Sequence, residues 1–112
     1  MPMPDSTIVF VALADIPAGG MHSCPSRQGE IVVCRTKDGI FALDNVCTHA
    51  FARLSEGRLR GTRVICPLHG ASFDVRDGRA LGPPASRALA THAAQVVGVH
   101  VEITLTPHER PR

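Results

Sequence analysis

Two short motifs in the middle of the chain carry side chains that bind metals. Cys47 and His49 form the first motif, Cys66 and His69 form the second, and residues 50–65 separate them. Two loops with this spacing could bring two thiolates and two imidazoles to one point. A tetrahedral zinc ion accepts that ligand set. A 2Fe-2S cluster also accepts it, with both thiolates on one iron and both imidazoles on the other.

The rest of the sequence predicts short β-strands around these loops. Gly, Asp, Asn and Pro recur between segments rich in β-branched residues, and Asp-Gly pairs mark turns at 37–39 and 76–78. In the last strand, apolar and polar residues alternate from Val99 to Leu105, which indicates one buried face. A short helix is expected only at 50–55. The expected strands are 7–12, 20–24, 30–35, 40–43, 62–66, 72–74, 95–97 and 100–106.

Further residues around the two motifs resemble the Rieske family, and more narrowly the small Rieske-type ferredoxins that supply bacterial aromatic-ring-hydroxylating dioxygenases. The resemblance runs from about Ile8 to Leu105. It is carried by Cys47-Thr48-His49, Leu54-Ser55-Glu56-Gly57, Cys66-Pro67-Leu68-His69-Gly70, Phe73-Asp74 and Leu81-Gly82-Pro83-Pro84.

This resemblance implies an all-β fold, a Rieske-like β-sandwich base with an inserted smaller cluster-binding subdomain. Residues 1–112 would form a single Rieske domain, with the base at 5–43 and 85–106, the subdomain at 44–84 and a frayed tail at 107–112. One Rieske-type 2Fe-2S cluster per chain would be held by Cys47 and Cys66 on the inner iron and by His49 and His69 on the outer iron.

Composition excludes several other classes of protein. The chain has 112 residues, enough for one domain. Its 12 basic residues are spread without a run against 10 acidic ones, which argues against nucleic-acid binding. Residues 1–7 lack the basic region of a secretory signal, and the longest apolar run, 8–14, is too short to span a membrane. We therefore expect a cytoplasmic protein whose cysteines are ligands or buried thiols.

Catalytic motifs are also absent from the sequence. It contains no GxGxxG, no GxSxG, no P-loop and no second His pair that could form a mononuclear iron site. We therefore expect an electron carrier and not an enzyme. The resemblance implies two partners, a flavin-containing NAD(P)H-dependent reductase and a terminal ring-hydroxylating oxygenase. The alternatives are a small Rieske-like subunit of a nitrite reductase and, in a different class, a zinc-stabilised interaction module.

The remaining cysteines and histidines are expected to have no role in metal binding. A hairpin closed by residues 25–29 would place Cys24 opposite Glu30 and Cys34 opposite Gly20, so these cysteines would not form a disulfide. Both are interpreted as small core or edge residues. Four histidines are interpreted as solvated surface side chains, namely His22, His92, His100 and His108.

Two properties of the 44–84 segment bear on electron transfer. It contains six arginines against four carboxylates, so it carries all of the excess positive charge of the chain and is expected to attract an acidic partner. The resemblance also allows a comparison with high-potential Rieske proteins, in which two extra cysteines bridge the cluster loops and a Ser and a Tyr hydroxyl donate hydrogen bonds to the cluster and a ligand thiolate. Here Ala52 and Leu68 stand at the bridging positions, Ala71 at the Ser position and Phe73 at the Tyr position. Because the two donors are missing, we expect a potential near the low end of the Rieske range of about −150 to +300 mV.

Overall fold

The structure, a computed structural model, describes residues 8–48, 52–68, 70–82 and 87–106. Within these ranges the chain forms β-strands and two single turns of 3-10 helix, η2 (Leu13–Asp15) and η3 (Leu54–Glu56). The strands are β1 (Ile8–Ala12), β2 (Met21–Ser26), β3 (Gly29–Thr36), β4 (Gly39–Asp44), β5 (Arg58–Arg60), β6 (Arg63–Ile65), β7 (Ser72–Asp74), β8 (Thr91–Val97) and β9 (His100–Thr104).

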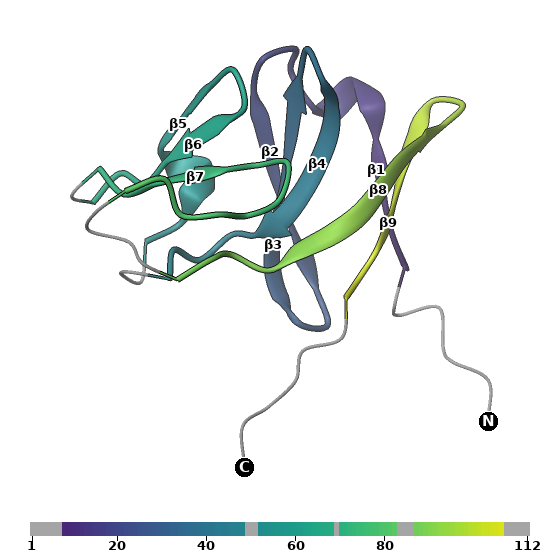
Figure 1. The fold of residues 1–112 in the computed structure, drawn as a ribbon. Helices are drawn as coiled ribbons and strands as arrows, with labels where there is room; N and C mark the ends of the chain where they lie inside the picture. The colour runs from purple at the N-terminus through teal and green to yellow at the C-terminus, as the bar shows by residue number, and fades with distance from the viewer. Residues whose placement is uncertain (1–7, 49–51, 69, 83–86, 107–112) are drawn as a thin grey trace.

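The strands form two antiparallel sheets of unequal size. The six-stranded sheet has the order β1-β9-β8-β4-β3-β2, so it combines strands from both ends of the chain. The three-stranded sheet, β5-β6-β7, comes from the middle of the chain and lies to the left in Figure 1. The predicted fold class, an all-β sandwich base with a smaller inserted subdomain, is confirmed.

Strand β3 separates two hydrophobic cores, because its side chains are buried on both faces. Ile31 and Val33 pack with residues of β1 and β9, whereas Val32 and Cys34 pack with residues of the small sheet and the loops around it. In Figure 1, β2, β3 and β4 accordingly lie between the small sheet and the group β1, β8 and β9. The loops that carry the cysteine motifs are therefore built on one face of a strand whose other face anchors the base.

The β2–β3 hairpin is tighter than expected. Ser26 pairs with Gly29, and the Ser26 hydroxyl donates to the Gly29 carbonyl and accepts a hydrogen bond from the Gln28 amide, which stabilises a two-residue turn. The expected register is therefore wrong by one residue. Cys24 lies opposite Ile31 and Cys34 opposite Met21. The conclusion drawn from that register still holds, since both cysteines are free thiols.

Three elements differ from the expectation. Strand β5, Arg58–Arg60, was not predicted, because an Arg-Leu-Arg sequence has a single apolar residue and no β-branched one. In place of a helix at 50–55, the described part has the 3-10 turn η3 at 54–56, and residues 50–51 lie outside the described residues. Strand β8 begins at Thr91, four residues before the expected start. The expected tail at 107–112 is not among the described residues.

No helix in the described residues is long and apolar enough to cross a membrane.

Candidate metal centre

Two cysteine thiols, one from each predicted motif, meet beneath the surface of the molecule. Cys47 follows β4 and is 4% exposed, and Cys66 directly follows β6 and is 1% exposed. The Cys66 thiol hydrogen-bonds to the Cys47 sulfur, and no disulfide joins the two residues. Residues 19 positions apart in sequence therefore present their sulfurs to one point, as the spacing of the motifs predicts.

The two cysteine loops close in the same way. The amide of Cys47 donates to the Ala52 carbonyl (3.0 Å), and the amide of Cys66 donates to the Ala71 carbonyl (2.7 Å). Each of these hydrogen bonds ties the cysteine to the residue five positions later, so each loop is a closed turn that begins at a buried sulfur. The Leu68 amide also donates to the Cys66 sulfur.

The predicted histidines, His49 and His69, each fall in sequence within one of these loops and lie outside the described residues. Among the residues that the structure does describe, no group of three or more His, Cys, Asp or Glu side chains could hold a metal ion. Of the four predicted ligands, the structure therefore describes the two cysteine sulfurs.

Burial raises the pKa of the Cys66 thiol, and the neighbouring Cys47 sulfur raises it further, whereas the Leu68 amide acts in the opposite direction. Two buried thiols in contact cannot both ionise cheaply without a nearby cation. A metal ion supplies that cation and replaces the protons. The chemistry of this donor pair therefore fits a thiolate-bound metal centre.

Asn45 positions the first cysteine loop, and the sequence analysis missed it. The Asn45 side chain is fully buried: its carbonyl oxygen accepts from the Ser55 amide (2.8 Å), and its amide nitrogen donates to the Ser55 hydroxyl (2.9 Å) and to Glu30 Oε1 (3.3 Å). Its backbone carbonyl also accepts from the Leu54 amide (2.7 Å). This residue therefore fixes the start of the Cys47 loop to β3 and to η3. The only sequence signal was an Asn two residues before a candidate ligand.

The second cysteine loop packs closely against the chain that follows η3. A Cβ on Gly57 would collide with the Ile65 carbonyl oxygen and would lie 3.1 Å from Pro67 Cδ. Glycine is therefore required at position 57 by close backbone approach. Gly57, Arg58, Cys66, Pro67 and Gly70 also line a shallow hollow beside the loop.

The other candidate residues have structural roles, with one correction. Cys34 is fully buried in β3, and burial raises the pKa of its thiol to about 12, while burial also raises the pKa of the half-buried Cys24 thiol. The interpretation of His92 as a solvated side chain is wrong. His92 is buried, its Nε2 lies 2.9 Å from Asp44 Oδ1, and its Nδ1 accepts a hydrogen bond from the Thr106 amide (3.0 Å).

The remaining histidines differ in exposure. His22 is partly exposed in β2, His100 is exposed at the start of β9, and His108 lies outside the described residues. Neither described residue adds a metal site, since no ligand group forms in the described part of the chain.

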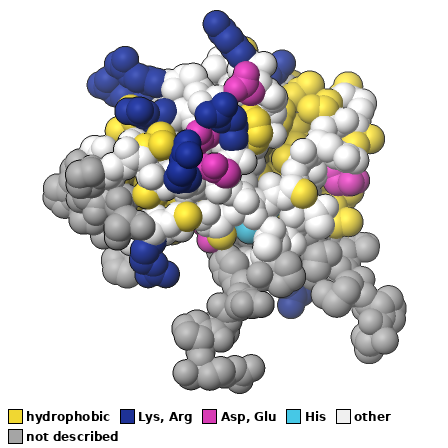
Figure 2. All heavy atoms as spheres, in the orientation of Figure 1, with side chains coloured by type: hydrophobic (Ala, Val, Ile, Leu, Met, Phe, Trp, Pro, Cys, Tyr) yellow, Lys and Arg dark blue, Asp and Glu magenta, His cyan; other side chains and the backbone are white. Residues whose placement is uncertain are grey.

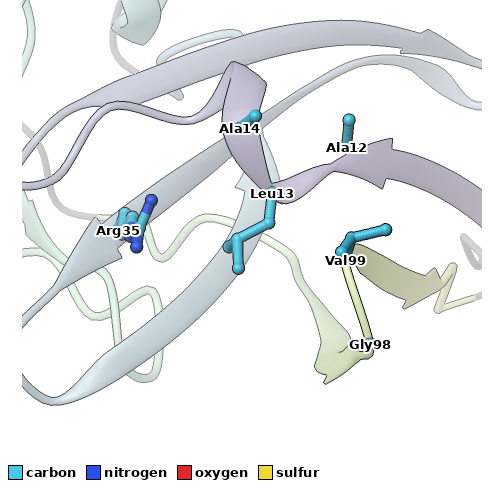
Figure 3. Close-up of a pocket in the computed structure, with 6 residues that line it drawn as sticks. All are labelled: Ala12, Leu13, Ala14, Arg35, Gly98 and Val99. Atoms are coloured by element: carbon cyan, nitrogen blue, oxygen red, sulfur yellow. The ribbon is translucent and has the colours of Figure 1, made fainter.

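A separate apolar hollow lies at the other end of the base, between η2 and the β8–β9 turn. Leu13, Arg35 and Val99 are among the residues that line it, and Figure 3 shows Leu13 between the other two. Neither cysteine nor histidine lines this hollow, so it is distinct from the metal centre.

Comparison with known proteins identifies the family. The family model described as "Rieske [2Fe-2S] domain" matches residues 6–93, which include both cysteine motifs. The chain belongs to the Rieske family. The Rieske [2Fe-2S] domain therefore carries a Rieske-type 2Fe-2S cluster as its cofactor, which agrees with the donor chemistry of the paired sulfurs.

Relatives of this Rieske chain are named as ferredoxins. It is 38% identical over 104 residues to the ferredoxin component of the naphthalene 1,2-dioxygenase system of Pseudomonas aeruginosa, covering 93% of this chain and 100% of the relative. Among solved structures, a complex of reduced oxygenase and oxidized ferredoxin in carbazole 1,9a-dioxygenase matches with a TM-score of 0.85 and 28% identity, over 93% of this chain and 99% of the matched chain.

A third likeness concerns the fold alone. A putative nitrite reductase small subunit from Mycobacterium tuberculosis matches with a TM-score of 0.74 at 19% identity, over 90% of this chain and 98% of the other. The nitrite reductase alternative therefore shares the fold with this chain and gains no further support.

Proposed function

We propose that this Rieske chain is the ferredoxin of an aromatic-ring-hydroxylating dioxygenase system. It accepts one electron at a time from a flavin-containing NAD(P)H-dependent reductase and delivers it to a terminal oxygenase in the cytoplasm. The observation that carries the proposal is the meeting of two buried sulfurs in matching loops of a Rieske domain, in a chain whose relatives are ferredoxin components. The chain is an electron carrier and not a catalytic enzyme.

We further propose the ligand assignment. Cys47 and Cys66 hold one iron through their sulfurs, and His49 and His69 hold the other iron. A bound 2Fe-2S cluster supplies a one-electron redox couple. The proposed domain boundaries, 44–84 for the cluster-binding part and 5–43 with 85–106 for the base, place all four ligands in the smaller part.

The chain's own residues would control that couple in three ways. Burial of both sulfurs keeps water from the inner side of the site. The Leu68 amide donates to the Cys66 sulfur, and such a bond strengthens as the sulfur gains negative charge, so it favours the reduced state. Closed loop turns and the Asn45 hydrogen bonds hold the sulfurs in place while the charge changes.

Single substitutions test the ligand assignment. Cys66→Ala and His49→Ala are each expected to abolish the visible absorption and the rhombic electron paramagnetic resonance signal of the reduced protein, because a cluster that lacks a ligand leaves an iron unsatisfied. Cys24→Ala is the matched control, since it removes a thiol from β2 outside both motifs. Full signal in Cys66→Ala would contradict the assignment. A colourless wild-type protein that contains zinc would support the zinc-module alternative.

A further inference from the structure

The structure divides the six arginines of the 44–84 segment into two groups. In the first group, carboxylates neutralise the side chains. Arg53 Nε lies 3.0 Å from Glu30 Oε1, while Arg76 Nη2 and Arg79 Nη2 lie 2.8 and 3.5 Å from Asp74 Oδ2. These three arginines are therefore committed to contacts within the chain.

The second group has no such partner. Arg58, Arg60 and Arg63 are exposed, and no described carboxylate lies within 4.0 Å of their guanidinium groups. We call these three residues the arginine face. Figure 2 shows Lys and Arg side chains at the upper left, over β5 and β6, without acidic side chains among them, whereas the two types intermingle nearer the centre of the view.

The arginine face destabilises the small sheet, β5-β6-β7. Arg60 and Arg63 are direct partners across the β5–β6 pair. Like charges placed directly opposite each other in an antiparallel pair are destabilising. Asp74 lies opposite Arg63 on the other neighbouring strand, β7, but its carboxylate is bound by Arg76 and Arg79. A negatively charged partner would therefore relieve the repulsion between Arg60 and Arg63.

The arginine face begins beside the metal centre. Arg58 pairs with Ile65, the residue before Cys66, and lines the same hollow as Cys66 and Gly70. Arg60 lies two residues farther along β5, or about 7 Å at the usual rise of a strand. A partner bound to these arginines would therefore lie against the loop that holds one of the two sulfurs.

Exposed apolar side chains lie close to both cysteines in the sequence. Val46 precedes Cys47 and is 42% exposed, and Leu68 follows Cys66 by two residues and is 47% exposed. Protein interfaces combine a desolvated apolar centre with a polar and charged rim. The apolar residues next to the cysteines and the arginines to one side fit that description.

We propose that the arginine face is the docking site for a carboxylate-rich surface of the terminal oxygenase. This inference rests on the proposed function, because it takes the oxygenase as a redox partner. Charge complementarity identifies the contacting groups as Asp and Glu, since arginines form paired hydrogen bonds with carboxylates. The oxygenase is the occupant because a solved relative of this chain is itself a complex of an oxygenase with ferredoxin.

Electron-transfer kinetics test the inference. The chemically reduced, cluster-loaded protein is mixed in a stopped-flow instrument with the terminal oxygenase, and reoxidation of the cluster is followed by absorbance. Salt is varied from about 0.01 to about 0.15 M, over which the Debye length falls from about 30 to about 8 Å. Binding to the immobilised oxygenase is measured in parallel, which separates docking from electron transfer.

Each of Arg58→Gln, Arg60→Gln and Arg63→Gln is expected to lower the second-order rate constant about fourfold at low salt, the factor for two unit charges roughly 5 Å apart in water. In the triple variant the rate constant is expected to fall roughly sixtyfold, and most of its salt dependence should disappear. The matched control is Arg27→Gln, which removes an exposed, unpaired arginine from the β2–β3 turn and should leave the rate within twofold. Unchanged spectra establish that every variant retains its cluster.

Two results would overturn the docking site while leaving the proposed function intact. One is a triple variant that binds and reduces the oxygenase as well as Arg27→Gln does. The other is a triple variant that is impaired only in accepting electrons from the flavin-dependent reductase. A wild-type protein that transfers no electrons to the oxygenase at any salt concentration would instead overturn the proposed function, and this inference with it.

Discussion

Replacing Asp74 with Asn is expected to lower the free energy of unfolding by about 2 kcal/mol at pH 7. Asp74 ends β7, and its side chain is 5% exposed. Arg76 donates from Nε to Oδ1 (3.0 Å), from Nη2 to Oδ2 (2.8 Å) and from its amide to Oδ1 (2.9 Å). This nearly buried carboxylate therefore joins β7 to the turn that follows it.

The expected magnitude comes from the pKa of Asp74. Hydrogen bonds from the Arg76 side chain are the main cause that lowers this pKa from 3.8 to about 2, against the opposing effect of burial. Each pKa unit corresponds to 1.36 kcal/mol, so the shift amounts to roughly 2.4 kcal/mol. Half of the Arg76 side chain is exposed, and solvent screening reduces the figure to about 2 kcal/mol.

The pH dependence has a definite sign. Because the pKa of Asp74 is lower in the folded state than in the unfolded state, its contribution is complete above pH 3.8 and is lost as the pH falls toward about 2. The difference between wild type and Asp74→Asn should therefore be equal at about pH 7 and pH 5 and should shrink below about pH 4.

Guanidinium unfolding of the iron-loaded proteins, followed by circular dichroism under anaerobic conditions, measures this difference. Asp77→Asn is the matched control. Asp77 lies in the same turn and is exposed, and its Oδ1 accepts from the Arg79 amide (3.0 Å), a bond that Asn can also accept. We expect a change of less than about 0.5 kcal/mol in this control. An Asp74→Asn variant no less stable than the Asp77→Asn variant would refute the reasoning.

Two further predictions concern the metal centre. Gly57→Ala should lower the free energy of unfolding by about 3 kcal/mol or more and reduce the bound iron, because the new Cβ collides with the Ile65 carbonyl. The control Gly61→Ala, at φ +61° in open space, should lower it by about 1 kcal/mol and keep its iron. Thermal unfolding and iron analysis measure both effects. The double variant Ala71→Ser with Phe73→Tyr should raise the midpoint potential in protein-film voltammetry by tens of millivolts, because each new hydroxyl can donate a hydrogen bond to the cluster or its thiolates. A hydrogen bond worth about 1 kcal/mol corresponds to roughly 40 mV. An unchanged midpoint in a folded double variant would contradict the hydrogen-bond explanation of the low potential.

Most of the larger sheet could be predicted because its strands follow simple local rules. The alternation in β9 correctly assigns Val101, Ile103 and Leu105 to the core, while Val99 is 72% exposed because it lies in the β8–β9 turn before the strand begins. Strand β5 could not be predicted in this way. Its residues pair with β6 because of their position between Gly57 and Gly61, and their own side chains do not favour a strand.

The candidate site was partly predictable for a related reason. Motif spacing identified the two cysteines, since ligands of one centre must lie close together in each loop. It could not identify Asn45 or His92, because burial of a polar side chain depends on which distant groups receive its hydrogen bonds. For Asn45 these groups are Glu30 and Ser55, and for His92 they are Asp44 and Thr106.

The four cysteines show that placement, and not acidity alone, decides which thiols can bind a metal. Burial raises the thiol pKa of Cys34 and of Cys66, so neither is an intrinsically reactive thiolate. Cys34 lies within β3, and its cross-strand partners are Met21 and Phe41, which offer no second strong ligand. Cys66 has the Cys47 sulfur and the Leu68 amide beside it. A metal cation can therefore replace the proton of Cys66 and gain two sulfurs at once, whereas at Cys34 it would gain one sulfur and lose the packing of the central strand.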